Sequence, residues 1–225
     1  MRTLLLSILI GLLIACGGTH GPATNYYKLD IPTAPAPGGP PPQAALRVEP
    51  FRTSDMLKQD RIVYRTSPVD VGFYEYHRWA EHPRDTVTKA VADQLEKRRV
   101  FQSVAISDDD DRSDYVLTGT IDRLQEVDYG GAVRVQVTIS VELQDQAQQR
   151  VIWSGAESSE SVVVRSDVSS VVAAMGQASQ QSIWRLTADV VKFVEKNRLA
   201  AYTPSAAKAP AAKAPAAKAP AAKAH

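Results

Sequence analysis

Cysteine is almost absent from this chain of 225 residues, and its single copy, Cys16, lies near the amino terminus. One cysteine cannot form an intramolecular disulfide, so no disulfide framework supports the fold. Only four histidines are present; His77 and His82 lie five residues apart with no second ligand cluster, which does not match zinc-ligand spacing. The main apolar run, residues 4–14, is shorter than the roughly 20 residues that a transmembrane helix requires.

Motifs of nucleotide binding and hydrolysis are also lacking. The chain contains no G-x-S-x-G, G-x-x-x-x-G-K-[ST] or G-x-G-x-x-G sequence. Residues 108–111 are four consecutive aspartates, but they lack the glycine turn and distal glutamate of a calcium loop and therefore predict a solvated turn. We expect no metal, no cofactor and no enzymatic activity. The alternative, a hydrolase, requires a nucleophile and a base within one cleft.

The amino terminus has the pattern of an exported protein. Arg2 precedes the apolar run at 4–14, which has the length of a signal-peptide core. The run ends in Leu-Ile-Ala-Cys at 13–16, which resembles the lipobox of bacterial lipoproteins. In that family the cysteine carries S-diacylglycerol and an N-acyl chain such as palmitate, and the segment before it is removed. An ordinary secretory signal with an incidental cysteine is the alternative.

We therefore expect residues 1–15 to be a signal peptide and residues 16–23 a flexible polar tether. Two or three acyl chains hold a protein on a membrane more durably than one, since each buried CH₂ contributes about 0.8 kcal/mol. Position 17 is glycine, not aspartate. By resemblance to the enterobacterial sorting rule, this favours the periplasmic face of the outer membrane over the inner membrane.

The carboxyl-terminal end, residues 201–225, is low in complexity and repeats A-A-K-A-P. A proline every five residues interrupts any helix, so we expect an extended, mobile tail. Four lysines give this tail a charge of +4, whereas residues 16–204 carry −4. The tail suits contact with peptidoglycan or lipid head groups, or it is a solvated spacer. Nucleic acid is not an expected partner, because the chain is exported.

Strict alternation dominates the middle of the chain. From 132 to 144 the residues Val133, Val135, Val137, Ile139, Val141 and Leu143 alternate with polar ones, which predicts a strand with one buried and one wet face. Strands are also predicted at 115–128 and 151–165, so the three form a meander with a turn at Gly130-Gly131. Shorter strands are expected at 24–30, 45–51, 61–65, 69–76 and 100–106.

Two segments have helical periodicity. One begins at Pro83 and ends near the cations at 97–99, and the other covers 168–197 with apolar residues at helical spacing. Both helices can cover one face of the sheet. The sequence therefore predicts a single α+β domain at 24–200, with an antiparallel sheet, two helices and a proline-rich loop at 32–43.

The segment 73–79, F-Y-E-Y-H-R-W, is unusually aromatic. At strand alternation Tyr74, Tyr76 and Arg78 share one face, and rings interleaved with charge suit a protein-binding patch. We select Tyr74, Tyr76, Arg78 and Trp79 as candidate contacts with a partner or a neighbouring subunit. The alternative, packing in the core, applies first to Phe73 and Trp79.

Several motifs taken together resemble those of the ABC-type transport auxiliary lipoproteins, which include the paraquat-inducible protein C type. The motifs are the lipobox, Y-Y-K-L at 26–29, R-I-V-Y-R at 61–65, Y-E-Y-H-R-W-A-E-H-P at 74–83 and D-Y-V-L-T-G-T-I at 114–121. The resemblance extends over about residues 13–197. The loop at 32–43 and the A-A-K-A-P tail depart from it.

The resemblance implies a non-catalytic, lipid-anchored periplasmic protein of an intermembrane phospholipid transport system. Its implied partners are a tube-forming MCE-domain protein and an ABC permease and ATPase complex, and it is implied to form ring-shaped homo-oligomers that receive the tube. The implied fold is similar to the amino-terminal domain of the translocation protein TolB. A lipoprotein regulator of peptidoglycan synthesis, or another envelope-assembly scaffold, is the alternative function.

Overall fold

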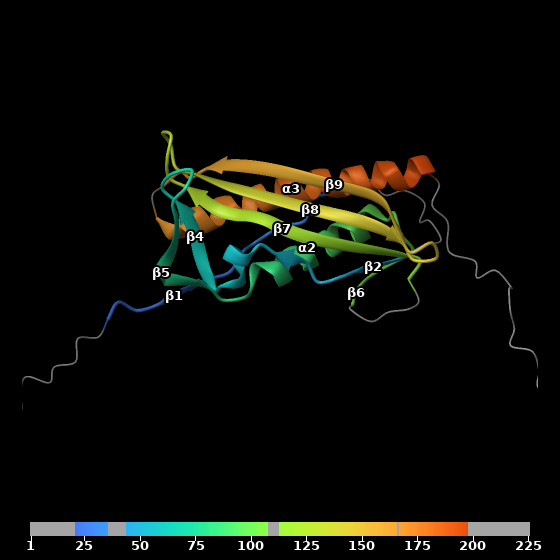
Figure 1. Cartoon of the computed structure of the whole chain (residues 1–225), viewed down its shortest axis with the longest axis horizontal. Helices are drawn as coiled ribbons and strands as arrows, with labels where there is room; N and C mark the ends of the chain where they lie inside the picture. The colour runs from blue at the N-terminus through green and yellow to red at the C-terminus, as the bar shows by residue number, and fades with distance from the viewer. Residues whose placement is uncertain (1–20, 36–43, 108–112, 166, 198–225) are drawn as a thin grey trace, which may run out of the picture.

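The computed structural model describes residues 21–35, 44–107, 113–165 and 167–197 (Figure 1). Within these residues, nine strands form one sheet, and two long helices accompany it. The strands are β1 (Asn25–Tyr27), β2 (Ala45–Val48), β3 (Arg52–Thr53), β4 (Arg61–Arg65), β5 (Val71–Trp79), β6 (Ser103–Ile106), β7 (Tyr115–Val127), β8 (Arg134–Asp145) and β9 (Arg150–Val162). The helices are α2 (Pro83–Arg98) and α3 (Val168–Asn197), with a 3-10 turn η1 (Asp55–Lys58).

Strand β7 is the centre of the sheet. One of its edges pairs with β8, and its other edge takes β2, β3 and β4 in succession. The strands β2, β3 and β4 are all parallel to β7, and β1–β5 and β2–β6 are parallel pairs as well. The predicted antiparallel meander β7–β8–β9 is confirmed, but the sheet as a whole is mixed. Parallel pairing was not predicted because it joins segments distant in the sequence.

The alternation along β8 is confirmed by burial. Val135, Val137, Ile139, Val141 and Leu143 are all at most 3% exposed. Gly130 and Gly131 adopt φ values of 77° and 117° in the β7–β8 turn, a region that glycine enters without steric cost. A one-residue slip of β8 would expose this entire apolar row, so the register is strongly specified.

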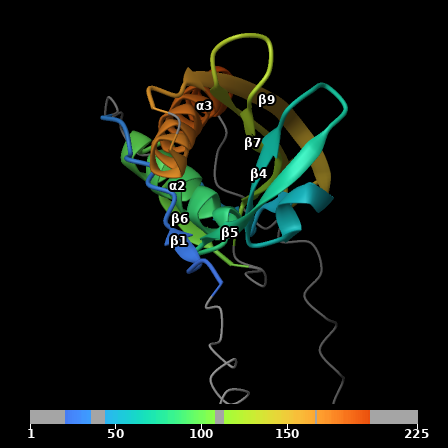
Figure 2. The same cartoon turned by 90° about the vertical axis from the view of Figure 1, so that its left-hand side faces the viewer.

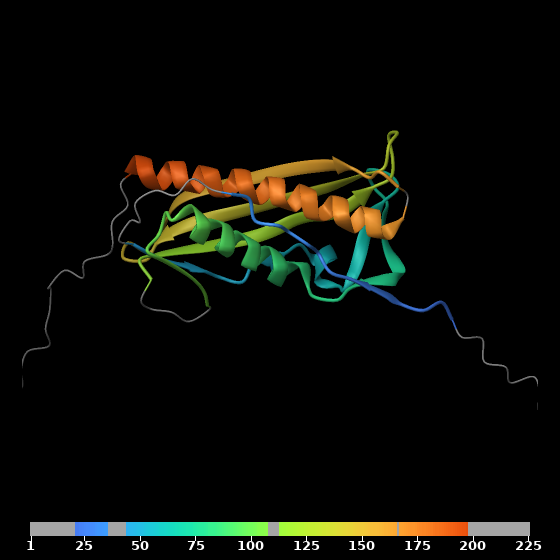
Figure 3. The ribbon, with the colours of Figure 1, turned by 180° about the vertical axis from the view of Figure 1, so that it is seen from behind.

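Both helices lie against the same face of the sheet (Figure 3). Pro83 occupies the first turn of α2, and the ring of His82 accepts a hydrogen bond from the amide of Arg84 at 3.2 Å. At the start of α3, the Asp167 carboxylate accepts a hydrogen bond from the amide of Ser170 at 2.8 Å. This contact holds the pKa of Asp167 below its usual range and satisfies an amide that the helix leaves free.

The segment that leads from β1 to residue 35 crosses the outside of the two helices (Figure 3). The Gln94 side chain of α2 exchanges hydrogen bonds with the backbone of Ala34 at 2.8 and 3.1 Å, and Gln180 of α3 donates to the Pro32 carbonyl at 2.8 Å. A Cβ atom on Gly176 would lie 2.2 Å from the Asp30 carbonyl oxygen, so only glycine permits this close approach. The amino-terminal segment is therefore fastened to the helices.

The buried residues form one apolar cluster between the sheet and the helices. Arg98 of α2 reaches into the helix–helix contact, where its Nε donates to Thr187 at 3.1 Å and its Nη2 donates to the Trp184 carbonyl at 2.8 Å. The guanidinium carbon also lies 5.5 Å from the centre of the Trp184 ring. Burial lowers the pKa of Arg98, and these contacts offset the cost of burying its charge.

A candidate docking groove on the open face of the sheet

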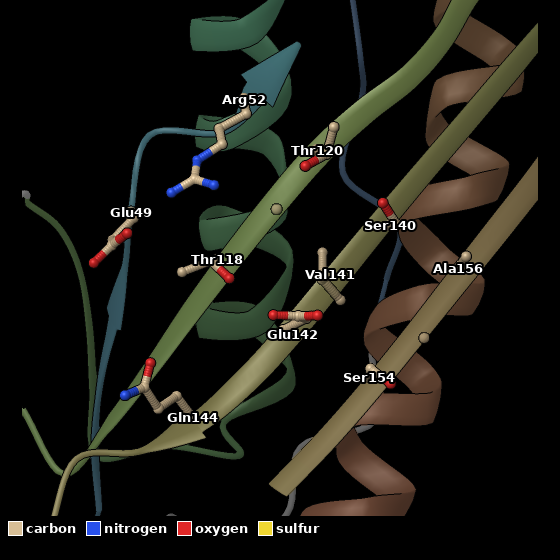
Figure 4. A pocket seen from close by; sticks show the side chains of 12 residues that line it. Glu49, Arg52, Thr118, Thr120, Ser140, Val141, Glu142, Gln144, Ser154 and Ala156 are labelled. Carbon is tan, nitrogen blue, oxygen red and sulfur yellow. The ribbon is translucent and has the colours of Figure 1, made fainter. Parts of the chain in front are cut away.

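The face of the β7–β8–β9 meander that points away from the helices is uncovered and polar. Thr118 and Thr120 of β7, Ser140 and Glu142 of β8, and Ser154 of β9 project from it (Figure 4). These side chains come from the polar half of the alternating pattern. Sheet pairing places Thr118 beside Glu142 and Glu142 beside Ser154, so the polar groups form rows across three strands.

Glu49 and Arg52 make the wall of a groove on this face, which has a volume of about 730 Å³ (Figure 4). Glu49 follows β2 and is held by its amide, which donates to the Leu117 carbonyl at 2.9 Å, and by an ion pair with Arg47 at 2.9 Å. Arg52 is carried by β3, the two-residue strand that pairs with Thr120 and Ile121 of β7. The groove therefore lies beside β7, at the point where pairing with β2 ends and pairing with β3 begins.

The polar groups of the groove are available to a partner. Among the described residues, Arg52 and Glu142 make no hydrogen bond or ion pair, whereas Ser140 is engaged with Asp122 at 2.8 Å. Thr118, Gln144 and Ser154 add further donors and acceptors. A groove that presents one free cation, one free anion and several hydroxyls suits hydrogen bonding and ion pairing with a polar protein surface.

The aromatic segment of β5 forms a compact cluster instead of a flat patch. Pairing between β4 and β5 shifts between Arg61–Arg78 and Val63–Phe73, so β5 carries extra residues and the simple alternation is broken. As a result the Tyr74 ring lies 5.4 Å from that of His77, although strict alternation would place residues 74 and 77 on opposite faces. The Tyr27 hydroxyl and the Nδ1 atom of His77 lie 2.8 Å apart in a hydrogen bond.

Tyr74 is tied into this cluster by its hydroxyl, which donates to Glu126 of β7 at 2.8 Å. Burial raises the pKa of Glu126, and the hydrogen bond from Tyr74 opposes part of that rise. Burial, followed by the contact with Glu126, raises the pKa of Tyr74 well above its usual range. Tyr74 thus satisfies a buried carboxylate and connects β5 to β7.

The other three predicted contact residues differ in accessibility. Trp79 is 5% exposed and belongs to the core, so its indole is not offered to a partner on the surface of one subunit. Arg78 is partly exposed and binds both carboxylate oxygens of Asp60 at 2.8 and 2.7 Å, which raises its pKa. Tyr76 is partly exposed, and a hydrogen bond with Glu75 raises the pKa of its hydroxyl. The structure thus leaves Tyr76 and Arg78 within reach of a second protein.

Sequence reasoning missed the groove. The polar face of β8 was predicted, but Glu49 and Arg52 lie around Pro50, where the sequence indicated only the end of a strand. Their position depends on the parallel pairing of β2 and β3 with β7, which no local pattern encodes. The sequence signal that could have found part of the groove was the polar alternation along β7, at Thr118 and Thr120.

Several predictions concern residues outside the described ranges: the signal peptide 1–15, the lipid site Cys16, the aspartates 108–111, and the tail 201–225. The predicted loop 32–43 is described only as far as residue 35. No helix within the described residues is long and apolar enough to cross a bilayer. The described residues also hold no group of three or more histidines, cysteines, aspartates or glutamates placed to bind a metal.

Comparison with known proteins identifies the family. The model of the ABC-type transport auxiliary lipoprotein component matches residues 27–190, which is most of the chain. The chain belongs to the ABC-type transport auxiliary lipoprotein family. This finding confirms the expected family. No functionally curated protein matches the sequence.

Solved structures support the fold of this auxiliary lipoprotein. A Xanthomonas campestris protein of the DUF330 family superposes with a TM-score of 0.69 at 22% identity, covering 77% of this chain and 99% of that one. An uncharacterized protein gives a TM-score of 0.57 at 19% identity, covering 75% and 99%. The PelC dodecamer of Paraburkholderia phytofirmans, at a TM-score of 0.39, 12% identity and coverage of 63% and 87%, is too distant to carry an argument. Likeness to TolB stays a prediction.

Proposed function

We propose that this auxiliary lipoprotein is a non-catalytic, lipid-anchored periplasmic component of an MCE and ABC-type intermembrane phospholipid transport system. The observation that carries the proposal is the family match over residues 27–190, with a lipobox ending at Cys16 ahead of it. Cys16 would carry S-diacylglycerol and an N-acyl chain and hold the protein at the periplasmic face of the outer membrane. No other cofactor is proposed.

The groove is the proposed docking surface for the MCE-domain protein. Docking between folded proteins favours surfaces with free polar groups whose charges can be complemented. The groove offers two such groups, Arg52 and Glu142. The helix-covered face is unavailable because its apolar side chains form the core. Tyr76 and Arg78, together with the internally bonded Tyr74, are the proposed contact between neighbouring subunits of a ring-shaped homo-oligomer.

Affinity purification from detergent-solubilised envelopes tests the proposal. The wild-type protein is expected to recover an MCE-domain protein and the ABC permease and ATPase. The double variant Arg52→Glu with Glu142→Lys is expected to recover them poorly, because both free charges are reversed. Glu195→Lys, on the exposed side of α3, is the matched control and should behave like wild type. Failure of the wild type to recover any MCE or ABC subunit would contradict the proposal.

Membrane placement has its own test. Separation of inner and outer membranes on a density gradient should place the wild-type chain in the outer-membrane fraction, and Cys16→Ser should remove it from that fraction. The same preparation tests subunit number: light scattering of the purified protein should show an oligomer, and Arg78→Glu should reduce its mass if Arg78 lies between subunits. A monomeric wild type would contradict the ring.

Regulation of peptidoglycan synthesis is the second candidate function. The observation that favours it is the position of the carboxyl end of α3, which lies at the opposite end of the molecule from β1 (Figure 1). Sedimentation with purified peptidoglycan distinguishes the two functions. Binding that disappears when residues 201–225 are deleted, with no MCE partner recovered, would favour this candidate.

A further inference from the structure

Exposed valines gather at one end of the sheet. The structure records a continuous cross-strand row, which we name the valine–arginine row: Val71, Arg65, Val127, Arg134 and Val162, each paired with the next across β5, β4, β7, β8 and β9. Paired residues in adjacent strands share a face, so apolar and cationic side chains alternate along this row. Val69 in the β4–β5 turn and Val164 after β9 extend the apolar part beyond the row.

These valines are unusually open to solvent. Val69 is 84% exposed, Val162 is 65% exposed and Val164 is 92% exposed, whereas Val127 in the middle of the row is buried. Isolated exposed apolar residues need no explanation, but several gathered at one end of a fold indicate a surface that is covered in the working state. The same end carries the β4–β5 and β7–β8 turns, which face the viewer in Figure 2.

The three arginines at this end each have a polar or charged partner. Arg134 forms an ion pair with Glu160 at 3.3 Å and lies 5.9 Å from the centre of the Tyr129 ring, and Arg165 pairs with Asp167 at 3.2 Å. Arg65 donates to the Pro68 carbonyl. Since each arginine already makes at least one such contact, the exposed apolar side chains are the more prominent uncovered groups at this end. This composition suits the interfacial layer of an uncharged membrane better than a strongly anionic surface.

The chain that leads to the proposed anchor leaves the body at this same end (Figure 1). Strand β1 runs parallel to the last residues of β5, with Asn25 beside His77 and Tyr27 beside Trp79, so the chain before Asn25 leaves the sheet beside this part of β5. Between Cys16 and Gly21 lie five peptide units, which span at most about 18 Å when fully extended. A lipidated Cys16 therefore keeps the first described residue close to the bilayer surface.

We infer that this end of the molecule, formed by Val69, Val71, Val162 and Val164, is a membrane-contacting surface that seats the body on the phospholipid interface beside the lipid anchor. The inference rests on the proposed anchor at Cys16. It gives the protein a fixed orientation, with the β8–β9 turn and the carboxyl end of α3 pointing away from the membrane and the groove on its side.

Site-specific labelling of the full, lipidated chain tests the inference. Since Cys16 is the only cysteine and its thiol is used by the lipid, V69C, V162C and V164C each supply a single reactive thiol. The matched control is V151C, because Val151 lies on the same strand β9 at its other end and is 49% exposed. Each variant carries an environment-sensitive fluorophore and is reconstituted into phosphatidylcholine vesicles with and without nitroxide-labelled lipid.

The expected result is a blue-shifted emission and several-fold stronger quenching by the nitroxide lipid at positions 69, 162 and 164 than at 151. Circular dichroism of each variant verifies that it is folded. Vesicle flotation reports the anchor separately: a chain that floats while all four probes are quenched equally overturns the inference and leaves the anchor intact. Absence of flotation would refute the anchor and this orientation with it. An emission shift that depends on protein concentration, without quenching by the nitroxide lipid, would indicate that this end contacts another copy of the chain. That result also overturns the inference.

Discussion

The two faces of strand β8 differ in what covers them. On one face Val137, Ile139 and Val141 lie under α3 and are almost fully buried. On the other face Thr138, Ser140 and Glu142 meet only neighbouring strands and the groove. Stability and partner binding can therefore be altered separately in this protein. The buried residues of β8 contribute to stability, and the alternating polar residues are available for partner binding. The predictions below test that separation.

The largest effect is expected from the pair Ile139→Ala and Thr138→Ala. The first removes a fully buried side chain and should lower the free energy of unfolding by about 2–5 kcal/mol through lost burial and a residual cavity. The second removes an exposed hydroxyl that bonds Ser158 at 3.0 Å and should change it by no more than about 0.5 kcal/mol. Urea denaturation measures both. Equal effects would break the distinction between the two faces.

Gly176→Val should act on the helical side at intermediate size. The new side chain would collide with the Asp30 carbonyl, and the required shift should cost about 1–3 kcal/mol and loosen residues 28–35 from the helices. Hydrogen exchange of this segment and urea denaturation report the two consequences. Ala173→Val, at an exposed position of the same helix, is the control and should leave the exchange of residues 28–35 unchanged.

Glu126→Gln should have a smaller effect whose size depends on pH. Glutamine keeps the acceptor for the Tyr74 hydroxyl and removes the charge. The pKa of Glu126 is raised in the folded state, so its contribution to stability is fully present below the unfolded value of 4.5 and is lost as pH rises through the folded pKa. The stability of wild type relative to the variant should therefore fall as pH rises above about 4.5. A difference that stays constant with pH would show that Glu126 is not the titrating group.

The double variant Arg52→Glu with Glu142→Lys should have the smallest effect on stability, within about 0.5 kcal/mol, because neither side chain has a partner among the described residues. Its effect on recovery of the MCE partner should be large. Thermal denaturation and affinity purification of the same sample measure the two quantities. A strongly destabilised variant would show that these charges support the fold, and its loss of binding would carry no weight.

Local patterns predicted much of this fold. The apolar spacing and the strict alternation predicted α3 and β8 well, because each pattern follows directly from covering one side of an element. The β7–β8 turn followed from Gly130-Gly131. The parallel strands beside β7 did not follow, since their pairing is fixed by packing between segments far apart in the sequence.

The site was predicted less well for the same reason. The extra residues in β5 turn Tyr74 inward to Glu126, which alternation alone could not indicate. The burial of Trp79 confirms the alternative of core packing for that residue. Arg52 faces the groove only because β3 pairs with β7. The polar face of the meander, by contrast, was readable from Thr118 and from the polar half of β8.

Photo-crosslinking in intact cells tests the docking surface most directly. A photoreactive residue at Thr120, on the floor of the groove, is compared with one at Glu195 on the exposed side of α3. The account predicts that position 120 crosslinks to an MCE-domain protein and that position 195 does not. Crosslinks to that protein from position 195 alone would contradict it.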